Sequence, residues 1–311
     1  MEGRHCSMFA SRVITVSIVA ALCTAACKKQ AATSCDFVSG DTPAAFVGLS
    51  GKTARDWQIE DALERREFTV GGYKLTLSPP VEWDMDPLSD RSWRFWLHTL
   101  IALEPLLQHH ERTGDPEALR RAVELALDWI ESNPLESSEI SEFAWYDMAV
   151  GYRAPYLSYL VRAVEAGGGF RSGTLKRLKC SAVEHAVWLH DDKNYKEAHN
   201  HGLYQDVGLF VAARHLAAHP FSKKWKQRAQ ARFLANLRDS VSIKDGFHLE
   251  HSPSYHVVVT NLLRRLAAES GIADGALDEL LPRMVEVAAW FLIPDGKYPQ
   301  LGDTDLDDAA R

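Results

Sequence analysis

The sequence predicts an all-α protein whose antiparallel helices form a toroid. Its composition, with 46% hydrophobic and 25% charged residues in a chain of 311, is that of a folded globule with a sizeable core. From residue 53 onward, apolar residues recur at helical spacing in long segments, and breaks rich in Gly and Pro separate these segments. The segments differ in length and share no repeated motif, which argues against a solenoid of uniform repeats.

The first expected element is an exception to the helical pattern. Phe68 to Leu77 (FTVGGYKLTL) places β-branched and aromatic residues on both sides of Gly71-Gly72. This pattern is typical of a short β-hairpin. Helices are expected to follow it over residues 91–112, 116–132, 143–164, 173–190, 201–218, 222–241, 253–269 and 276–293.

The N-terminus has the pattern of an export signal. Arg4 and Arg12 precede an apolar run of about 14 residues, which is too short to span a bilayer. The predicted signal peptide is 1–26, so we expect an exported, periplasmic or outer-membrane-anchored protein. Small residues before Cys27 also resemble a lipobox, which leaves a lipid tether at Cys27 and plain signal cleavage as alternatives. Residues 27–52 are expected to form a tether, and two further cysteines, Cys35 and Cys180, are too few for a disulfide framework.

The formal net charge is −7, and no dense block of Lys and Arg stands out. Nucleic acid is therefore not an expected partner. No cofactor is indicated. His248, His251 and His256 lie close in sequence, but they do not match a recognised metal-ligand spacing, so no metal site is predicted.

Short connections predict that neighbouring helices run antiparallel. The helices that start near residues 91, 143, 201 and 253 would then point the same way, and their N-termini would meet at one end of the domain. The segment 295–303 would emerge at that end as well. The polar and aromatic residues expected to share this cleft are Trp145, Tyr146, Asp147, Asn200, His201, Ser252, Tyr255, His256 and Tyr298.

Two of these helix starts are suited to bind an anion. Ser252-Pro253 is typical of a helix start, and it places Tyr255 in the first turn, where the helix dipole favours negative charge. Asn200 is expected to cap a helix that begins at His201. A carboxamide and an imidazole can donate hydrogen bonds to a carboxylate, and a tyrosine can remove a proton and return it to a leaving oxygen. These parts suit β-elimination on a uronic acid sugar.

The same residues resemble a known family. Over about residues 60–305 the sequence is similar to the heparinase II/III and alginate lyase superfamily of polysaccharide lyases. The matching segments are Trp83–Trp96, Trp145–Arg153 (WYDMAVGYR), Asn200-His201-Gly202, Asp245–His256 (DGFHLEHSPSYH) and 294–303 (PDGKYPQLGD). Each motif alone is weak, but their order and spacing together are specific.

The resemblance implies an incomplete α/α toroid followed by a C-terminal β-sandwich. It implies that Asn200 neutralises the substrate carboxylate, that His201 assists or acts as base, and that Tyr255 transfers the proton. We expect a lyase domain over 53–305, with 306–311 as a tail or the start of a C-terminal domain. The sequence contains no run of strands that could build the β-sandwich, so we expect either a fragment or a truncated relative, and catalysis by this chain alone is left open.

Other residues are candidates for binding an anionic polysaccharide or oligosaccharide. Trp145 and Tyr146 are expected to stack on sugar rings, and Arg153 to pair with a carboxylate. Glu250 is interpreted as orienting Tyr255 or His251, with an exposed charge as the alternative. His251, His256 and Tyr298 complete the predicted binding set. An unsulfated uronate polymer such as alginate fits the acidic balance better than heparin.

Two other functions remain open at this level. A helical-toroid glycoside hydrolase would use two carboxylates, with Asp147 and Glu250 as candidates. A glycan-binding lipoprotein without catalysis would bind oligosaccharide but not turn it over. Purely structural interpretations also stand: Asn200 as a simple helix cap, Tyr255 and His256 as ordinary first-turn residues, and most tryptophans as core. The oligomeric state is not indicated.

Overall fold

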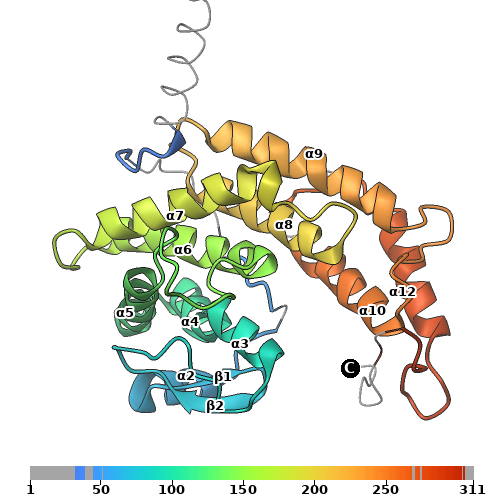
Figure 1. Ribbon diagram of the computed structural model, residues 1–311, viewed down its shortest axis with the longest axis horizontal. Helices are drawn as coiled ribbons and strands as arrows, with labels where there is room; N and C mark the ends of the chain where they lie inside the picture. Colours follow the sequence, from blue (N-terminus) through green and yellow to red (C-terminus); the bar gives the residue numbers. More distant parts are fainter. Residues whose placement is uncertain are drawn as a thin grey trace, which may run out of the picture.

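The computed structural model describes residues 32–38, 45–50, 52–267, 270–273, 275–302 and 304. Figure 1 shows an open arc of helices, with a small hairpin below its green and cyan part. The N-terminal part holds α2 (Asp56–Glu60), the π-helical turn η1 (Asp61–Arg65), β1 (Glu67–Val70) and β2 (Tyr73–Thr76). The helices that follow are α3 (Arg91–His98), α4 (Glu104–Thr113), α5 (Pro116–Ser132), α6 (Asp147–Gly167), α7 (Thr174–His190), α8 (Asn200–His215), α9 (Ser222–Ser240), α10 (Pro253–Leu262) and α12 (Leu280–Trp290).

The architecture confirms the predicted all-α class and the incomplete toroid. The long helices pack against one another, and the packing is most extensive between α6 and α8 and between α8 and α9. Short turns of 3-10 helix, η2 (Ile101–Leu103) and η3 (Asp192–Asn194), and a π-helical turn η4 (Leu263–Ala267) join or extend them. Within the described residues, the hairpin is the one sheet present, so no part of a β-sandwich is seen there.

The predicted hairpin is confirmed, with short strands. β1 and β2 pair antiparallel, and Val70 faces Tyr73 across the two-residue turn Gly71-Gly72. Both turn glycines have positive φ, which glycine adopts without steric cost and which matches the twist of a tight hairpin. Trp93 of α3 donates its indole N–H to the carbonyl oxygen of Val70 at 3.0 Å, which fixes the hairpin to the helices.

Two predicted helix boundaries are wrong. The helix expected over 91–112 is divided into α3 and α4 by η2, and Leu100 has a left-handed φ of 57°. Pro105 explains the division: proline has no amide hydrogen and its ring clashes with the preceding turn, so it is accepted in the first turn of α4 but not inside a longer helix. The helix expected from 143 begins at Asp147, after a turn over 142–145.

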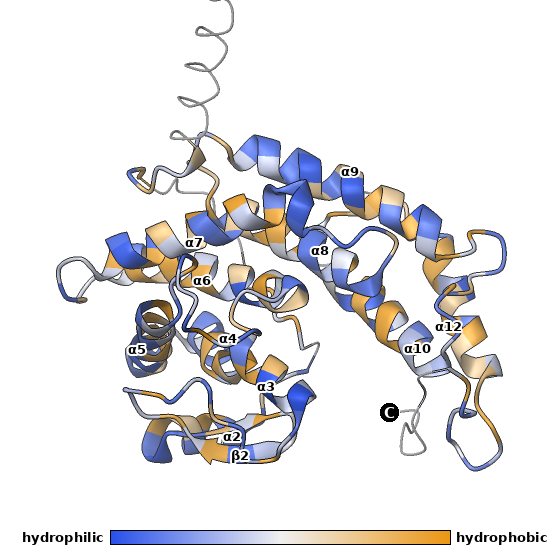
Figure 2. Cartoon of the chain, in the orientation of Figure 1, coloured by the Kyte–Doolittle hydropathy of each residue, from blue (hydrophilic) through white to orange (hydrophobic). Residues whose placement is uncertain are grey.

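The core confirms the structural interpretation of most tryptophans. Trp93, Trp129 and Trp225 are each about 1% exposed. Trp290, at the end of α12, is an exception, since 79% of its surface is exposed. In Figure 2, α9 is predominantly hydrophilic, as expected for a helix that covers α8 and turns its other side to solvent.

The described part of the predicted tether is packed on the helices, which corrects the expectation for 27–52. Cys35 forms a disulfide with Cys180 of α7, although the cysteine count had predicted no disulfide framework. Phe37 accepts a hydrogen bond from Lys179 at its carbonyl oxygen, at 2.7 Å. Val47 and Leu49 are buried in the core. These residues therefore belong to the folded unit rather than to a free linker.

The predicted signal peptide, Cys27 and the tail 306–311 lie outside the described residues. Across the part of the chain that the structure describes, no helix combines the length and apolar character needed to cross a membrane.

Candidate active site

The starts of α3, α6 and α8 meet at one end of the arc, as alternating helix direction predicted. The guanidinium of Arg91, the first residue of α3, lies 5.8 Å from the ring centroid of Tyr146, which directly precedes α6. The Tyr146 ring in turn contacts the imidazole of His201, the second residue of α8, with ring centroids 5.9 Å apart.

The start of α10 is connected to the same end of the arc by α9, whose last turns contact the residues before α8. Asn236, near the end of α9, donates its amide N–H to the carbonyl oxygen of His199 at 3.1 Å. The chain leaving α9 then folds back: Val241 pairs with His248 in an isolated β-bridge, and α10 begins at Pro253. The later segment closes on this helix start, because Ser252 and Thr304 are joined through their hydroxyl groups at 3.0 Å.

Asn200 is the first residue of α8 rather than its cap, which corrects the sequence prediction. His199 is the capping residue, and its Nδ1 accepts a hydrogen bond from the backbone N–H of His201 at 3.1 Å. The Asn200 side chain is 3% exposed, and its Oδ1 has no hydrogen-bond partner among the described residues. A buried amide with unused hydrogen-bonding capacity is costly unless a ligand or water completes it. The Asn200 oxygen can accept a hydrogen bond, and the amide nitrogen of the same side chain is the atom that could donate one to a carboxylate.

His201 is paired with a carboxylate that the sequence analysis had assigned to another role. Its Nδ1 lies 2.9 Å from Oδ1 of Asp147, and Lys196 Nζ lies 3.7 Å from Oδ2 of the same carboxylate. Burial raises the pKa of Asp147, but the hydrogen bond and charge of His201, the N–H of Met148 and the charge of Lys196 outweigh burial and lower that pKa. A carboxyl with a lowered pKa is unsuited to act as the general acid of a glycoside hydrolase.

Tyr255 occupies the first turn of α10, as predicted. The Ser252 side chain caps this helix by accepting the backbone N–H of Tyr255, and Pro253 takes the first helical position. The Tyr255 side chain is half-buried. Because the free N–H groups of a helix start carry partial positive charge, this position favours a phenolate over the same group in solution.

His248 is a residue of this end that the sequence analysis did not assign to the site. It is 2% exposed, and its Nδ1 has no hydrogen-bond partner within the described residues, since the nearest carboxylate oxygen, on Glu250, is 3.9 Å away. Burial, together with the charges of His256 and His199, lowers its pKa to about 4. His248 is the fourth residue of the motif Asp245–His256, so the sequence could have drawn attention to it. Its burial and its interaction with His199 are seen only in the packed structure.

A family model described as Heparinase II/III N-terminus matches residues 44–311. The chain belongs to the heparinase II/III N-terminus family.

Relatives of this heparinase-family chain are themselves named as lyases. A heparin-sulfate lyase of Pedobacter heparinus is 22% identical over 90% of this chain and 43% of its own length. A second heparin-sulfate lyase, from Bacteroides thetaiotaomicron, is 21% identical over 77% of this chain and 35% of its own length. The chain thus spans less than half the length of these curated relatives.

Solved structures share the fold. The crystal structure of heparan sulfate lyase HepC from Pedobacter heparinus matches with a TM-score of 0.60 and 22% identity, over 88% of this chain and 43% of that one. The crystal structure of heparinase III matches with a TM-score of 0.62 and 18% identity, over 88% and 44%. At these identities the likeness establishes the fold of the heparinase-family chain.

Two predicted binding residues of the heparinase-family chain are structural. Arg153 is completely buried; its Nε donates to His185 Nε2 at 3.0 Å, and its other nitrogens donate to the carbonyl oxygens of His98 and Ala144. His256 is also fully buried, with Nδ1 accepting from the N–H of His248 and Nε2 donating to the carbonyl oxygen of Met284. All their polar atoms are occupied, so neither residue is free to bind substrate.

The remaining predicted binding residues differ in accessibility. Trp145 is half-buried against the rings of Trp129 and His185, and its indole N–H donates to Asn133, so most of it belongs to the core. Tyr298 is 8% exposed. Tyr146, directly before α6, and Glu250, two residues before the cap of α10, are half-buried, and His251 is exposed.

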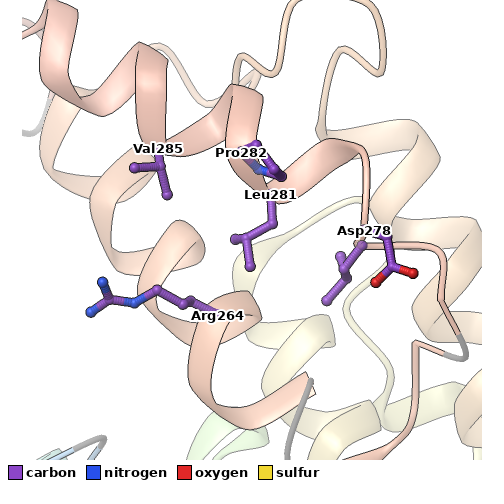
Figure 3. Close-up of a pocket in the computed structure, with 6 residues that line it drawn as sticks. Arg264, Asp278, Leu281, Pro282 and Val285 are labelled. Carbon is purple, nitrogen blue, oxygen red and sulfur yellow. The ribbon is translucent and has the colours of Figure 1, made fainter.

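One cavity lies away from these helix starts. It has a volume of about 580 Å³ and is bounded by η4 and α12 and the turn before α12. Figure 3 shows Arg264, Asp278, Leu281, Pro282 and Val285 around it. None of the predicted site residues lines it. No group of three or more His, Cys, Asp or Glu suited to a metal ion occurs in the described part of the chain.

Proposed function

We propose that this chain is the helical domain of a polysaccharide lyase that cleaves uronic acid-containing glycosaminoglycans by β-elimination. The observation that carries the proposal is the placement of the Asn200 amide and the His201–Asp147 pair at the adjoining starts of α6 and α8, with Tyr255 in the first turn of α10. Membership of the heparinase II/III family supports the same reaction.

In this reaction a proton is removed from the carbon next to the carboxylate. The site must therefore make that carbon more acidic. Asn200 donates hydrogen bonds from its amide nitrogen to the substrate carboxylate and so stabilises the charge that develops when C5 of the uronic acid loses its proton. His201, whose Nδ1 is paired with Asp147, assists beside the sugar as a base through Nε2. Tyr255, as phenolate, takes that proton. The electron pair left on C5 forms the C4–C5 double bond, the C4–O bond breaks, and the Tyr255 hydroxyl returns the proton to the leaving oxygen.

The residues fit these roles through their positions. An ordinary tyrosine has a pKa of about 10, so a phenolate needs local positive charge. The start of α10 supplies partial positive charge beside Tyr255. Asn200, on the first turn of α8, offers its amide without adding a negative charge that would repel the substrate.

The relatives support one substrate class over another. Both curated relatives named above are heparin-sulfate lyases, so we favour a glycosaminoglycan over the alginate that the acidic net charge suggested. We also retain the proposals of export through residues 1–26 and of a lipid tether at Cys27. Pulse-labelling with a fatty acid, compared between the native chain and Cys27→Ala, tests the tether.

The experiment is an ultraviolet assay for the unsaturated product. Purified protein is incubated with heparan sulfate, heparin and alginate in the presence of a chelator. We expect absorbance to rise with heparan sulfate first. Tyr255→Phe should abolish the rise while oligosaccharide binding persists, whereas Asn200→Ala should weaken both.

Tyr73→Phe is the matched control, since Tyr73 lies on the hairpin strand β2, is 38% exposed and should not affect turnover. Full activity of Tyr255→Phe would overturn the assignment of the base. Binding of oligosaccharide with no unsaturated product from the native chain would replace the lyase proposal by a glycan-binding function.

A further inference from the structure

The contact between His201 and Asp147 connects two helices that are far apart in the sequence. The two residues are 54 positions apart, and each stands in the first turn of its helix, Asp147 on α6 and His201 on α8. The Asp147 side chain is 8% exposed and that of His201 is 21% exposed. The carboxylate therefore lies beneath the imidazole, and the ring retains an accessible part.

The carboxylate determines which ring nitrogen carries the hydrogen. Asp147 also receives the N–H of Met148 and lies near the ammonium of Lys196, and its lowered pKa means that it is ionised near neutral pH. An ionised carboxylate only accepts hydrogen bonds, so Nδ1 of His201 must be the N–H that faces it. In the neutral ring, Nε2 is then the unprotonated nitrogen.

The charged and titratable groups around the pair come from several elements. Lys196 approaches from the loop before α8, and His199 contacts the His201 ring with centroids 4.4 Å apart. Tyr146 packs on His201 from the start of α6, Arg91 of α3 lies against Tyr146, and His248 of the loop before α10 interacts with His199. Within the described residues, Asp147 is the carboxylate recorded in contact with His201.

We propose that Asp147 is a positioning residue of the site: it holds His201 as the Nδ1–H tautomer and directs Nε2 of the ring towards the substrate. This inference rests on the proposed lyase function for its kinetic part only. Because Asp147 already holds the His201 ring in one orientation, no free energy is spent on ordering the ring during the reaction. Carboxylates orient imidazoles in this way in other enzymes.

The test uses two variants of Asp147 and one control variant in which the same substitution, aspartate to asparagine, is made at another position. Asp147→Asn removes the obligate acceptor but keeps the size, and Asp147→Glu keeps the acceptor. Asp115→Asn is the control, because Asp115 caps α5 and contacts His109 at 3.2 Å, a second aspartate–histidine pair at a helix start. Asn is as good a helix cap as Asp, so this control should fold normally.

The first measurement is ¹⁵N NMR of the histidine side chains, with the His201 signals assigned by their loss in His201→Gln. We expect the neutral His201 ring of the native protein to be the Nδ1–H tautomer, Asp147→Asn to give a mixture of tautomers, and Asp147→Glu to restore the native form. The second measurement is lyase kinetics. Asp147→Asn should lower kcat about 10- to 100-fold with little change in KM, and Asp147→Glu should recover part of kcat. Asp115→Asn should leave both measurements unchanged.

The two measurements separate the inference from the function. An unchanged His201 tautomer in Asp147→Asn overturns the inference, as does an unchanged kcat in a folded and active protein. A third outcome is that the native protein shows the Nδ1–H tautomer and Asp147→Asn loses it, while the native protein releases no unsaturated product. That result refutes the lyase function and leaves the positioning of His201 by Asp147 supported. Far-ultraviolet circular dichroism and melting confirm that each variant is folded, and Asp147→Glu tests the inference should Asp147→Asn fail to fold.

Discussion

Gly151 of α6 and Gly208 of α8 bring the two central helices into backbone contact. A β-carbon placed on Gly208 would lie 2.2 Å from the carbonyl oxygen of Gly151, and one placed on Gly151 would lie 2.9 Å from the carbonyl oxygen of Tyr204. Both obstacles are backbone atoms, which cannot turn aside as a side chain can. This close crossing sets the distance between the helix starts that carry Asp147 and His201.

Gly208→Ala should therefore destabilise the fold. Forcing a methyl group into this crossing should lower the free energy of unfolding by about 1–3 kcal/mol, measured by urea denaturation. Gly167→Ala is the control, because a β-carbon at this last residue of α6 meets only a methyl carbon of Leu119 at 3.8 Å. Equal stability of the two variants would show that the crossing is looser than the structure indicates.

Arg153 should act on stability rather than on substrate affinity. Its guanidinium lies 3.8 Å from the ring centroid of Trp129, and its loss would leave His185 Nε2 and two buried carbonyl oxygens without donors. We expect Arg153→Met to lower the free energy of unfolding by on the order of 3 kcal/mol in urea titrations. Arg171→Met, at an exposed position, is the control. A stable Arg153→Met protein with a raised KM would instead restore the carboxylate-binding interpretation.

The Cys35–Cys180 disulfide should stabilise the domain by closing a long loop. The two residues are 145 positions apart, so the crosslink removes much conformational freedom from the unfolded chain. Cys35→Ser should lower the free energy of unfolding by about 2–4 kcal/mol, seen as an earlier urea midpoint. Reducing agent should have the same effect on the native protein and no further effect on the Cys35→Ser/Cys180→Ser double variant. A native protein whose midpoint is insensitive to reduction would contradict this prediction.

Buried histidines should make the fold sensitive to mild acid. Burial lowers the pKa of His215 from 6.5 to about 4. The unfolded chain therefore takes up a proton at this residue before the folded chain does, and stability falls as the pH is lowered from about 6.5 to about 4. At pH 4.5 this residue alone should cost on the order of 2 kcal/mol relative to pH 7.5.

His215→Gln isolates this contribution, since other groups also titrate in the same range. The variant is expected to be less stable at pH 7.5, because Ser158 and the carbonyl oxygen of Ala45 lose a well-placed partner. The loss of stability between pH 7.5 and pH 4.5, measured by urea denaturation, should however be smaller than in the native protein. An identical loss in both proteins would rule out His215 as a source of the acid sensitivity.

Local features of the sequence predicted much of the fold. Apolar spacing and the Gly and Pro breaks located the helices, Gly71-Gly72 located the hairpin turn, and Ser252-Pro253 located the start of α10. Because each of these signals acts within one or two helical turns, it can be read without knowing the neighbours of the segment. The alternation of helix direction also predicted that the helix starts share one end.

The details of the site were decided by tertiary structure. Sequence patterns suggested Arg153 as a carboxylate ligand, but its position inside the core is set by which face of α6 packs against α5 and α7. The pairing of His201 with Asp147, like the disulfide between Cys35 and Cys180, joins residues that are distant along the chain. The sequence by itself determined which residue types stand at the helix starts. Only the packing of α6 against α8, through Gly151 and Gly208, decided which of them touch, because contact depends on distances between helices that no local pattern records.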